Sequence, residues 1–343
     1  MNRLWGGCVT RSIHDLVTPA LLVDVDAFEH NLDTMSKALP GARLRPHVKA
    51  HKCSAIAARQ AAAGHRGFTC ATAREAQGLA ESGLGEDLLL ANELVDATRL
   101  SELAELVAAG ARVTIAVDSQ ATIDAAVHAG IKEVVIDVNV GLPRCGCSPD
   151  EAGSLAARAR GHGLSVRGVM GYEGHIVGLE DRARREEGCA ESMQKLKAAH
   201  DEVGGELISA GGTGTYDCNH VASEIQAGSY ILMDGAYGKL GLPFRQALHL
   251  WSTVISVSAK FCVADCGLKS LGMDHGNPTL DGAKVWFCSD EHTTFAPERA
   301  LAVGDRVRVT PAHVDPTIAY HERIHLVSGD EVLETWPVDL RGW

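Results

Sequence analysis

Short β-rich runs alternate with Ala-rich amphipathic runs from about residue 42 onward, and this alternation restricts the possible folds more than any other feature. Eight runs have the composition of strands: 42–50, 67–72, 87–92, 112–117, 133–140, 165–173, 206–212 and 223–228. The runs between them have a helical period: 53–63, 73–82, 96–109, 119–129, 149–162 and 181–203. This repeat predicts a parallel sheet, and eight strands match a (β/α)8 barrel. The alternative, a doubly wound open sheet, would need only about five or six strands.

Residues that favour helix ends support these boundaries. Asp96 and Ser119 are candidate N-caps, because their side-chain oxygens can accept from the first free backbone N–H groups. Ser148 precedes Pro149, which fits the first position of a helix. Glycine, which readily adopts the left-handed conformation that ends helices, follows four predicted helices: Gly64, Gly83, Gly110 and Gly130.

The character of the sequence changes after about residue 245. The later segments "LWSTVISVSAKFCVAD", "AKVWFCSDEHTTFA", "DRVRVTPAH" and "IHLVSGDEVLETWPV" read as strands joined by turns, with no helical period. We therefore predict a barrel over 26–245 and a smaller all-β domain over 246–343. The strand-like segment 18–26 lies outside the count of eight, and we expect residues 1–25 to join the β-domain.

Charge and composition argue against several classes of protein. Asp and Glu number 44 against 32 Lys and Arg, and the net charge of −12 disfavours a nucleic-acid or anionic-membrane surface. No apolar run is long enough to span a bilayer, and "MNRLWGGCVTRSIHDL" lacks the apolar core of a signal peptide. The ten cysteines are scattered through core-like segments and read as free thiols, so we expect a cytoplasmic protein. Cys145 and Cys147 lack the Cys-x-x-Cys spacing of a metal or redox pair.

The stretch "RPHVKAHK" concentrates basic side chains in this acidic chain. On a strand, Arg45, His47 and Lys49 share one face, and the polar face of a barrel strand points inward because helices cover the outside. An inward lysine is costly unless it is paired or used, and burial would lower its pKa, as a Schiff-base amine requires. A basic strand end in solvent fits the spacing equally well.

Two glycine-rich turns follow the last two predicted strands. The turn "SAGGTGTYD" (209–217) offers backbone N–H groups and Thr hydroxyls that can bind a phosphate, and "AGSY" (227–230) lies after the eighth strand. Neither turn has the pattern of a Walker loop or of a dinucleotide fingerprint. Phosphate sites of barrel enzymes frequently follow strands seven and eight. A lysine facing such a site suggests pyridoxal 5'-phosphate (PLP), which needs both.

Three further side chains fall at the predicted carboxyl ends of strands. Tyr172 and His175 lie in "GYEGH", where they fit the rim of an active site. Arg144, in "VGLPRCG", can meet a carboxylate or a cofactor. Taken singly, Tyr172 and His175 fit slightly better as a core-edge aromatic and a surface histidine. The alternative for Arg144 is an ordinary loop arginine.

A possible metal pair lies in the β-domain. In "VTPAHVDPT", His313 and Asp315 are two residues apart and would project from one face of a strand. An imidazole and a carboxylate form a partial site for a divalent ion, with water or substrate completing the coordination. A simple His–Asp hydrogen bond is the alternative. The neighbouring His321, His325 and His292 read as structural residues.

Taken together, these motifs resemble those of a known family, the D-threonine aldolase group of fold-type III, alanine-racemase-like PLP enzymes. This group also contains 3-hydroxy-D-aspartate aldolase and D-serine dehydratase. The resemblance covers nearly the whole chain and rests on "TPALLVD", "RPHVKAHK", "IDVNVG", "RCG", "GYEGH", "GGTGTY", "QAGSYILMD", "ADCGLKS", "SDEH" and "PAHVDPT".

The resemblance implies a barrel plus a β-domain, usually as a homodimer, with Lys49 as the lysine that bonds PLP. The positions that would contact the cofactor are His47, Lys49, Arg144, Tyr172, Gly212, Thr213, Gly228, Ser229 and Tyr230. His313 and Asp315 fall on the family's metal pair. His175 falls where the family places the catalytic base or its water relay.

One of these positions bears on the reaction. The dehydratase branch resembles His-x-Cys at the metal pair, which suits Zn²⁺, whereas Asp315 supplies a carboxylate that favours Mn²⁺ or Mg²⁺. We therefore expect a PLP- and metal-dependent aldolase that cleaves D-β-hydroxy-α-amino acids to glycine and an aldehyde. A dehydratase acting on D-serine or hydroxyaspartate is the main alternative. An amino-acid racemase, which has no use for a metal pair, and a non-catalytic PLP-binding protein, which usually lacks the second domain, are less favoured.

Overall fold

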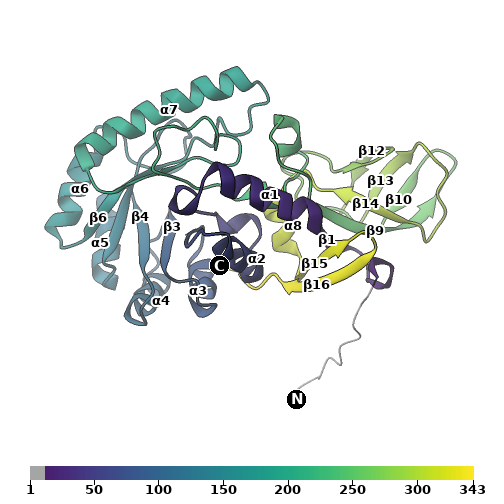
Figure 1. Ribbon diagram of the computed structural model, residues 1–343, viewed down its shortest axis with the longest axis horizontal. Helices are drawn as coiled ribbons and strands as arrows, with labels where there is room; N and C mark the ends of the chain where they lie inside the picture. Colours follow the sequence, from purple (N-terminus) through teal and green to yellow (C-terminus); the bar gives the residue numbers. More distant parts are fainter. Residues whose placement is uncertain (1–11) are drawn as a thin grey trace, which may run out of the picture.

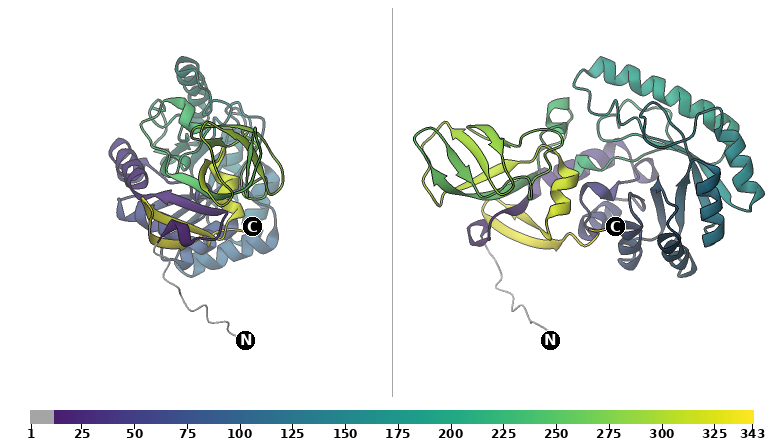
Figure 2. Two further views of the ribbon diagram at one scale, coloured as in Figure 1. Left: turned by 90° about the vertical axis from the view of Figure 1, so that its right-hand side faces the viewer. Right: turned by 180° about the vertical axis from the view of Figure 1, so that it is seen from behind.

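The computed structural model describes residues 12–343 and shows two β-systems at opposite ends of an elongated molecule (Figure 1 and Figure 2). One end is a parallel barrel covered by helices, and the other is antiparallel. The short helix α8 (Val314–Tyr320) lies between them. Residues 1–11, which include most of the segment where we expected no signal peptide, lie outside the described residues.

The parallel system confirms the predicted barrel class. Its strands follow one another in chain order: β2 (Gly67–Cys70), β3 (Asp87–Glu93), β4 (Val113–Val117), β5 (Glu133–Asp137), β6 (Ser165–Gly171), β7 (Leu207–Ala210) and β8 (Glu224–Ile225). The helices of this end are α1 (Val25–Ala38), α2 (Ser54–Ala62), α3 (Ala73–Glu81), α4 (Ala97–Ala108), α5 (Gln120–Ala129), α6 (Ala152–Gly161) and α7 (Arg182–Val203). Most of these elements begin and end within three residues of the predicted boundaries.

An extended segment, 44–47, occupies the eighth strand position between β8 and β2. The backbone N–H of Arg45 donates to the carbonyl of Ile225 (2.9 Å), and the N–H of Thr69 donates to the carbonyl of Pro46 (2.9 Å). The segment therefore closes the barrel through single bridges on each side.

The expectation of a regular strand over 42–50 is wrong. Two 3-10 turns replace most of it: η2 (Gly41–Arg43) and η3 (Val48–Ala50). Pro46 has no N–H to donate to a ladder. After it the chain turns, and the ring Nδ1 of His47 accepts from the backbone N–H of Lys49 (3.4 Å). This turn, rather than strand alternation, sets the direction of the Lys49 side chain.

Arg45 points into the barrel but toward the end opposite Lys49. Its guanidinium contacts Glu224 and Asp87, each at 2.7 Å, and these are the first residues of β8 and β3. Arg167 of β6 binds the second oxygen of Asp87 (2.7 Å). A buried layer of paired charges therefore fills the amino-terminal end of the barrel, and Arg45 is structural.

Side-chain caps fix several helix starts as predicted. Asp96 accepts from the N–H of Arg99 (2.9 Å), and Ser119 forms a reciprocal capping box with Thr122. The expected start of α6 at Pro149 is wrong, because 148–151 forms a turn and the helix begins at Ala152.

The antiparallel system contains the N-terminal strand, as predicted. Its strands pair in the order β10 (Cys262–Ala264), β13 (Thr293–Pro297), β12 (Ala283–Cys288), β11 (Thr279–Leu280), β14 (Arg306–Thr310), β9 (Leu248–Val257), β1 (Ala20–Asp24), β15 (Arg323–Ser328) and β16 (Glu331–Pro337). Strand β1 runs parallel to β15 and antiparallel to β9. A further pairing of β10 with β9 closes part of this sheet on itself.

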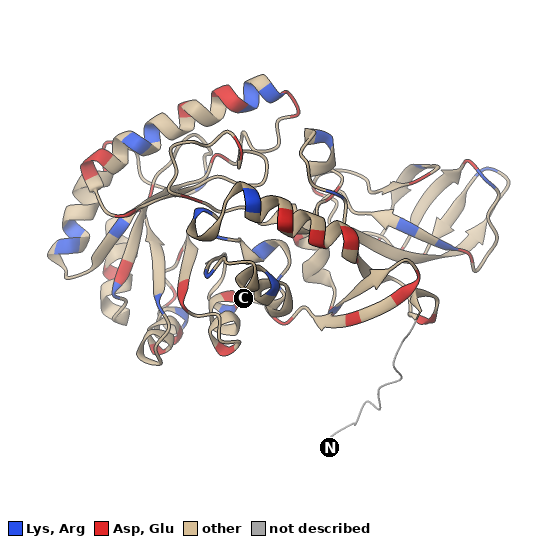
Figure 3. Cartoon of the chain, viewed as in Figure 1, with Lys and Arg blue, Asp and Glu red and all other residues tan. Residues whose placement is uncertain are grey.

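Acidic and basic residues are interspersed along the chain, for example along α7 (Figure 3). Within residues 12–343, no helix is long and apolar enough to cross a membrane. The nine cysteines of this part of the chain are all unpaired, in agreement with the expected free thiols.

Candidate active site

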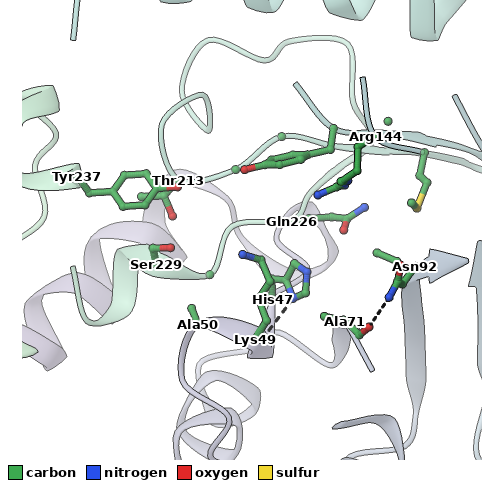
Figure 4. Close-up of a pocket in the computed structure, with 17 residues that line it drawn as sticks. His47, Lys49, Ala50, Ala71, Asn92, Arg144, Thr213, Gln226, Ser229 and Tyr237 are labelled. Carbon is green, nitrogen blue, oxygen red and sulfur yellow. Dashed lines mark hydrogen bonds between the residues drawn. The ribbon is translucent and has the colours of Figure 1, made fainter. Parts of the chain in front are cut away.

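A cavity opens at the carboxyl ends of the barrel strands, where barrel enzymes carry their active sites. It encloses about 910 Å³ including its mouth, and 17 residues line it. They come from 47–50, from the last residues of β3 and β6, and from the segments that follow β2, β5, β6, β7 and β8. Figure 4 shows Thr213, Ser229 and Tyr237 at one end, Arg144 and Asn92 at the other, and Lys49 between them.

Lys49 projects into this cavity from η3, and its amine contacts the carboxylate of Asp315 on α8. The side chain is 41% exposed, because it borders the cavity. Burial alone would lower the pKa of the amine, but attraction to Asp315, reinforced by Tyr172, raises it above its ordinary value. The expectation of a lowered pKa is therefore wrong in this environment, because the carboxylate outweighs desolvation.

His47 is buried beside Lys49 and remains neutral. Desolvation and the neighbouring Lys49 charge hold its pKa well below the ordinary value. Its carbonyl packs against Gly228, where a Cβ would approach that oxygen to 2.5 Å. Only glycine therefore fits at position 228, and its backbone forms part of the cavity wall.

The two predicted phosphate turns meet at one end of the cavity. Gly212, Thr213, Gly228 and Ser229 all line it, as the resemblance implies. Tyr230 lies differently, because its ring is fully buried and its hydroxyl accepts from Gln60 (2.9 Å) outside the cavity.

The backbone N–H of Tyr230 donates to the hydroxyl oxygen of Thr213 (3.0 Å). This bond joins the turn after β7 to the turn after β8. Tyr230 thus orients Thr213, and its own side chain supports the core.

The buried carboxylate of Glu173 binds the glycine-rich turn 209–217 through hydrogen bonds. It accepts from the hydroxyl of Thr215 (2.8 Å) and from the backbone N–H of Gly211 (3.3 Å). Burial raises its pKa, although these donors oppose the shift. Glu173 lies in the motif "GYEGH", between Tyr172 and Gly174. The sequence did not indicate that its side chain points inward, and only the fold shows this.

Arg144 and Tyr172 pack together beside the cavity. The Arg144 guanidinium lies 5.4 Å from the centre of the Tyr172 ring, a cation–π distance. Both line the cavity, together with Gln226, whose amide donates to Ser209 (2.8 Å). Gln226 and Tyr237 were not predicted from the sequence.

His175 is exposed at the rim and is not among the cavity-lining residues. Its ring packs against Gly141, where a Cβ would come within 2.6 Å of the imidazole. The structure thus places His175 against the segment that follows β5, whereas Tyr172 lines the cavity.

His313 and Asp315 lie at the start of a helix, so the strand expected for them is wrong. Asp234 accepts from the N–H of Val314 (2.8 Å) and, through its other oxygen, from the N–H of Tyr237 (2.8 Å). This fully buried carboxylate caps α8 from 80 residues earlier in the chain, a contact that no local pattern indicates.

One carboxylate oxygen of Asp315 is free to bind a ligand. This oxygen, Oδ1, is buried and has no hydrogen-bond partner among residues 12–343. The charge of Lys49 lowers the pKa of Asp315 despite burial, so the carboxylate is ionised. An ionised oxygen without a donor near an imidazole suits a divalent cation.

Two carboxyl groups meet beneath Arg144. Asp137, at the end of β5, is buried and lies close enough to Glu93, at the end of β3, to be affected by its charge. Burial and the charge of Glu93 raise the pKa of Asp137 well above its ordinary value, and Arg144 opposes the shift only in part. Asp137 therefore holds its proton to a higher pH than a free carboxyl group does.

Comparisons with known proteins agree with this geometry. A family model for the alanine racemase N-terminal domain matches residues 23–234, and a serine dehydratase domain matches residues 247–327. A D-threonine aldolase from Arthrobacter sp. is 33% identical over 95% of this chain and 93% of the relative. The chain belongs to the D-threonine aldolase group of the alanine-racemase-like enzymes. The resemblance read from its motifs is thereby confirmed.

Two further members of the group are similar over nearly their whole length. A 3-hydroxy-D-aspartate aldolase from Paracoccus denitrificans (strain Pd 1222) is 32% identical over 96% of this chain and 93% of the relative. The crystal structure of D-threonine aldolase from Filomicrobium marinum aligns with a TM-score of 0.91 at 35% identity, covering 97% of both chains. These relatives are named as carbon–carbon lyases, and the family depends on PLP.

The cavity fits that cofactor. An amine at its centre can bond an aldehyde, and two glycine turns with the Thr213 and Ser229 hydroxyls at one end can hold a phosphate. Larger residues cannot replace Gly228 without displacing the backbone at His47. The shape of the cavity, its hydrogen-bond donors and the Lys49 amine therefore all suit PLP.

Proposed function

We propose that this chain is a PLP- and divalent-cation-dependent aldolase that cleaves D-β-hydroxy-α-amino acids to glycine and an aldehyde. The contact between Lys49 and Asp315 carries the proposal, because it brings the cofactor lysine and the cation pair into one site. Mn²⁺ and Mg²⁺ suit a His–carboxylate pair better than Zn²⁺ does.

The residues divide the work by position. Lys49 would bond the cofactor, Thr213 and Ser229 would bind its phosphate, and Tyr172 with Arg144 would fix its ring from the side. PLP supplies an electron sink for the carbanion formed when the bond between Cα and Cβ breaks.

His313 and Asp315 would hold the cation, which supplies Lewis-acid polarisation of the β-hydroxyl oxygen. We propose His175, at the rim, as the acceptor of the β-hydroxyl proton. As the bond between Cα and Cβ breaks, the β-carbon becomes the aldehyde, and Cα takes up a proton to give glycine.

A substrate panel tests the proposal. We expect D-threonine, D-phenylserine or 3-hydroxy-D-aspartate to yield glycine and an aldehyde in the presence of Mn²⁺. The serine dehydratase domain over 247–327 favours dehydration as the second candidate. Ammonia and a 2-oxo acid in place of glycine would establish that reaction, and no product from any substrate would contradict both.

Two further parts of the proposal concern the state of the protein. The unpaired thiols support a cytoplasmic location. The resemblance supports a homodimer, which light scattering of the purified protein would detect as twice the chain mass.

A further inference from the structure

We infer that Asp274 is a positioning residue that fixes the tautomer and direction of His313, so that the Nε2 atom of His313 faces the proposed cation. This role rests on the proposed function, because it requires that His313 bind a cation. The residues that carry the argument lie on the loop 270–276 and at the start of α8.

The central contact is a hydrogen bond between a ring nitrogen and a carboxylate. The Oδ2 atom of Asp274 lies 2.7 Å from the Nδ1 atom of His313. A carboxylate accepts, so Nδ1 is the donor, and in the neutral ring that binds a cation Nε2 keeps its lone pair. Histidine ligands commonly donate their second nitrogen in this way, which orients the ring and strengthens its basicity.

The imidazole of His275 stacks on one face of the His313 ring. The two imidazoles stack with centres 3.9 Å apart and planes inclined by 10°. Nitrogen lone pairs lie in the ring plane, so those of two nearly parallel stacked rings cannot converge on one ion. His275 is therefore packed against the His313 ring but is not a second ligand.

Hydrogen bonds and close packing hold the loop that carries Asp274 against the start of α8. The N–H of Gly272 donates to the hydroxyl oxygen of Thr317 (2.8 Å), and that hydroxyl donates to the carbonyl of His313 (2.7 Å). A Cβ at Gly272 would overlap the ring of Pro316, so only glycine lets the loop come this close. The carboxylate of Asp274 is thereby held beside His313.

The alternative to this positioning role is a cation site formed by Asp274, His275 and His313 together. Donor atoms of Asp274, His275 and His313 all lie within 4.8 Å of one another, a spacing at which all three could share one ion. The stacked rings argue against it. So does exposure: the Asp274 side chain is 57% exposed, whereas that of Asp315, at the cavity, is 16% exposed.

Mn²⁺ binding to the PLP-loaded enzyme tests the inference. We expect Asp274→Ala to weaken Mn²⁺ binding by about 10- to 100-fold, the usual cost of losing such a partner. Asp274→Asn should fall between Asp274→Ala and the wild type, because a neutral amide oxygen is a weaker acceptor. His275→Ala is the matched control, and we expect a change within about threefold.

Pulsed electron paramagnetic resonance of the bound Mn²⁺ gives a second measurement. One histidine nitrogen on the ion in both wild type and His275→Ala supports the inference. Two nitrogens in the wild type, or loss of Mn²⁺ binding in His275→Ala, would show direct ligation by this loop and overturn it.

The visible absorbance of the bound cofactor reports folding in each variant. Asp274 is exposed, so we expect the absorbance of all three variants to match that of the wild type. Unchanged Mn²⁺ affinity in Asp274→Ala would overturn the positioning role alone. Absence of Mn²⁺ binding by the wild-type enzyme would overturn the cation site as well, and thus the proposed function.

Discussion

The carboxylate of Asp315 contacts the amine of Lys49 across the junction of the two β-systems, between residues 266 positions apart in the chain. The lysine comes from the turn that closes the barrel, and the carboxylate from the first turn of α8. This pairing makes one site of two motifs that are separate in the sequence. It also gives Asp315 a fixed orientation, because the buried turn holds the lysine backbone.

Substitution of the two lysines of "RPHVKAHK" is expected to affect different properties, cofactor binding for Lys49 and stability for Lys52. Lys49→Ala should abolish the visible cofactor absorbance, because Lys49 is the amine of the cavity. Lys52 instead pairs with Glu75, whose side chain is fully buried. Lys52→Ala should keep the absorbance but cost about 3 kcal/mol of unfolding free energy, because it leaves a buried charge unpaired. Absorbance titration and thermal unfolding of both variants check this, and loss of absorbance only in Lys52→Ala would reverse the assignment.

Asp315→Cys is expected to change the preferred cation. A thiolate beside the His313 imidazole is a softer donor set, which binds Zn²⁺ more tightly than Mn²⁺. We expect Mn²⁺ affinity to fall at least about tenfold and Zn²⁺ affinity to rise, measured by competition titration of the metal-stripped protein. Asp33→Cys, on the exposed face of α1, is the control and should leave both affinities unchanged. Equal Mn²⁺ binding by Asp315→Cys and the wild type would exclude Asp315 as a ligand.

Asp234 is expected to matter for the cation although its hydrogen bonds go to the backbone N–H groups of Val314 and Tyr237, and not to the side chains of the proposed ligands. Asp234→Ala removes the cap of α8 and should cost about 1 kcal/mol of unfolding free energy. Because α8 carries His313 and Asp315, we also expect weaker Mn²⁺ binding. Asp96→Ala removes an exposed cap from α4, at a residue that does not line the cavity, and should lower stability with no effect on the cation. A purely structural role of Asp234 would make the two variants indistinguishable in Mn²⁺ titrations.

The sequence predicted the barrel well because each strand and helix carries its own local signal. It predicted Lys49 correctly as a cavity residue for a partly wrong reason: the 3-10 turn capped by the His47 ring, and not strand alternation, directs it there. The same error placed Arg45 beside Lys49, whereas its partners Asp87 and Glu224 hold it at the other end of the barrel.

The remaining misses depend on distant contacts. Nothing within "PAHVDPT" indicates a helix start, because the cap comes from Asp234. Asp274 reads as an ordinary loop residue until the fold brings it to His313. Glu173 and Gln226 stand inside or beside quoted motifs, but their direction into or under the cavity depends on the closure of the barrel.

Acid should weaken the charged layer at the base of the barrel. Burial would raise the pKa of Asp87, but bonds from Arg167 and Arg45 lower it to about 2. A carboxyl group with a depressed folded-state pKa stabilises above its unfolded pKa of about 3.8, and this stability is lost as the pH falls toward 2. Asp87 should thus contribute about 2 kcal/mol at pH 7. Asp87→Asn should flatten the acid limb of the unfolding curve, and Asp33→Asn, an exposed pair, should not.

Glu93→Gln is expected to stabilise the protein at neutral and alkaline pH. Burial and Glu93 raise the pKa of Asp137, and a carboxyl group with a raised folded-state pKa contributes stability that is lost as the pH rises above its unfolded value. An amide at position 93 removes the like charge and can donate to Asp137. Each unit by which the pKa of Asp137 falls corresponds to about 1.4 kcal/mol, so we expect a gain on the order of 1 kcal/mol at pH 8 and little at pH 4. Thermal unfolding across this range measures it, with the exposed Glu86→Gln as control. A loss of stability at pH 8 would contradict this prediction.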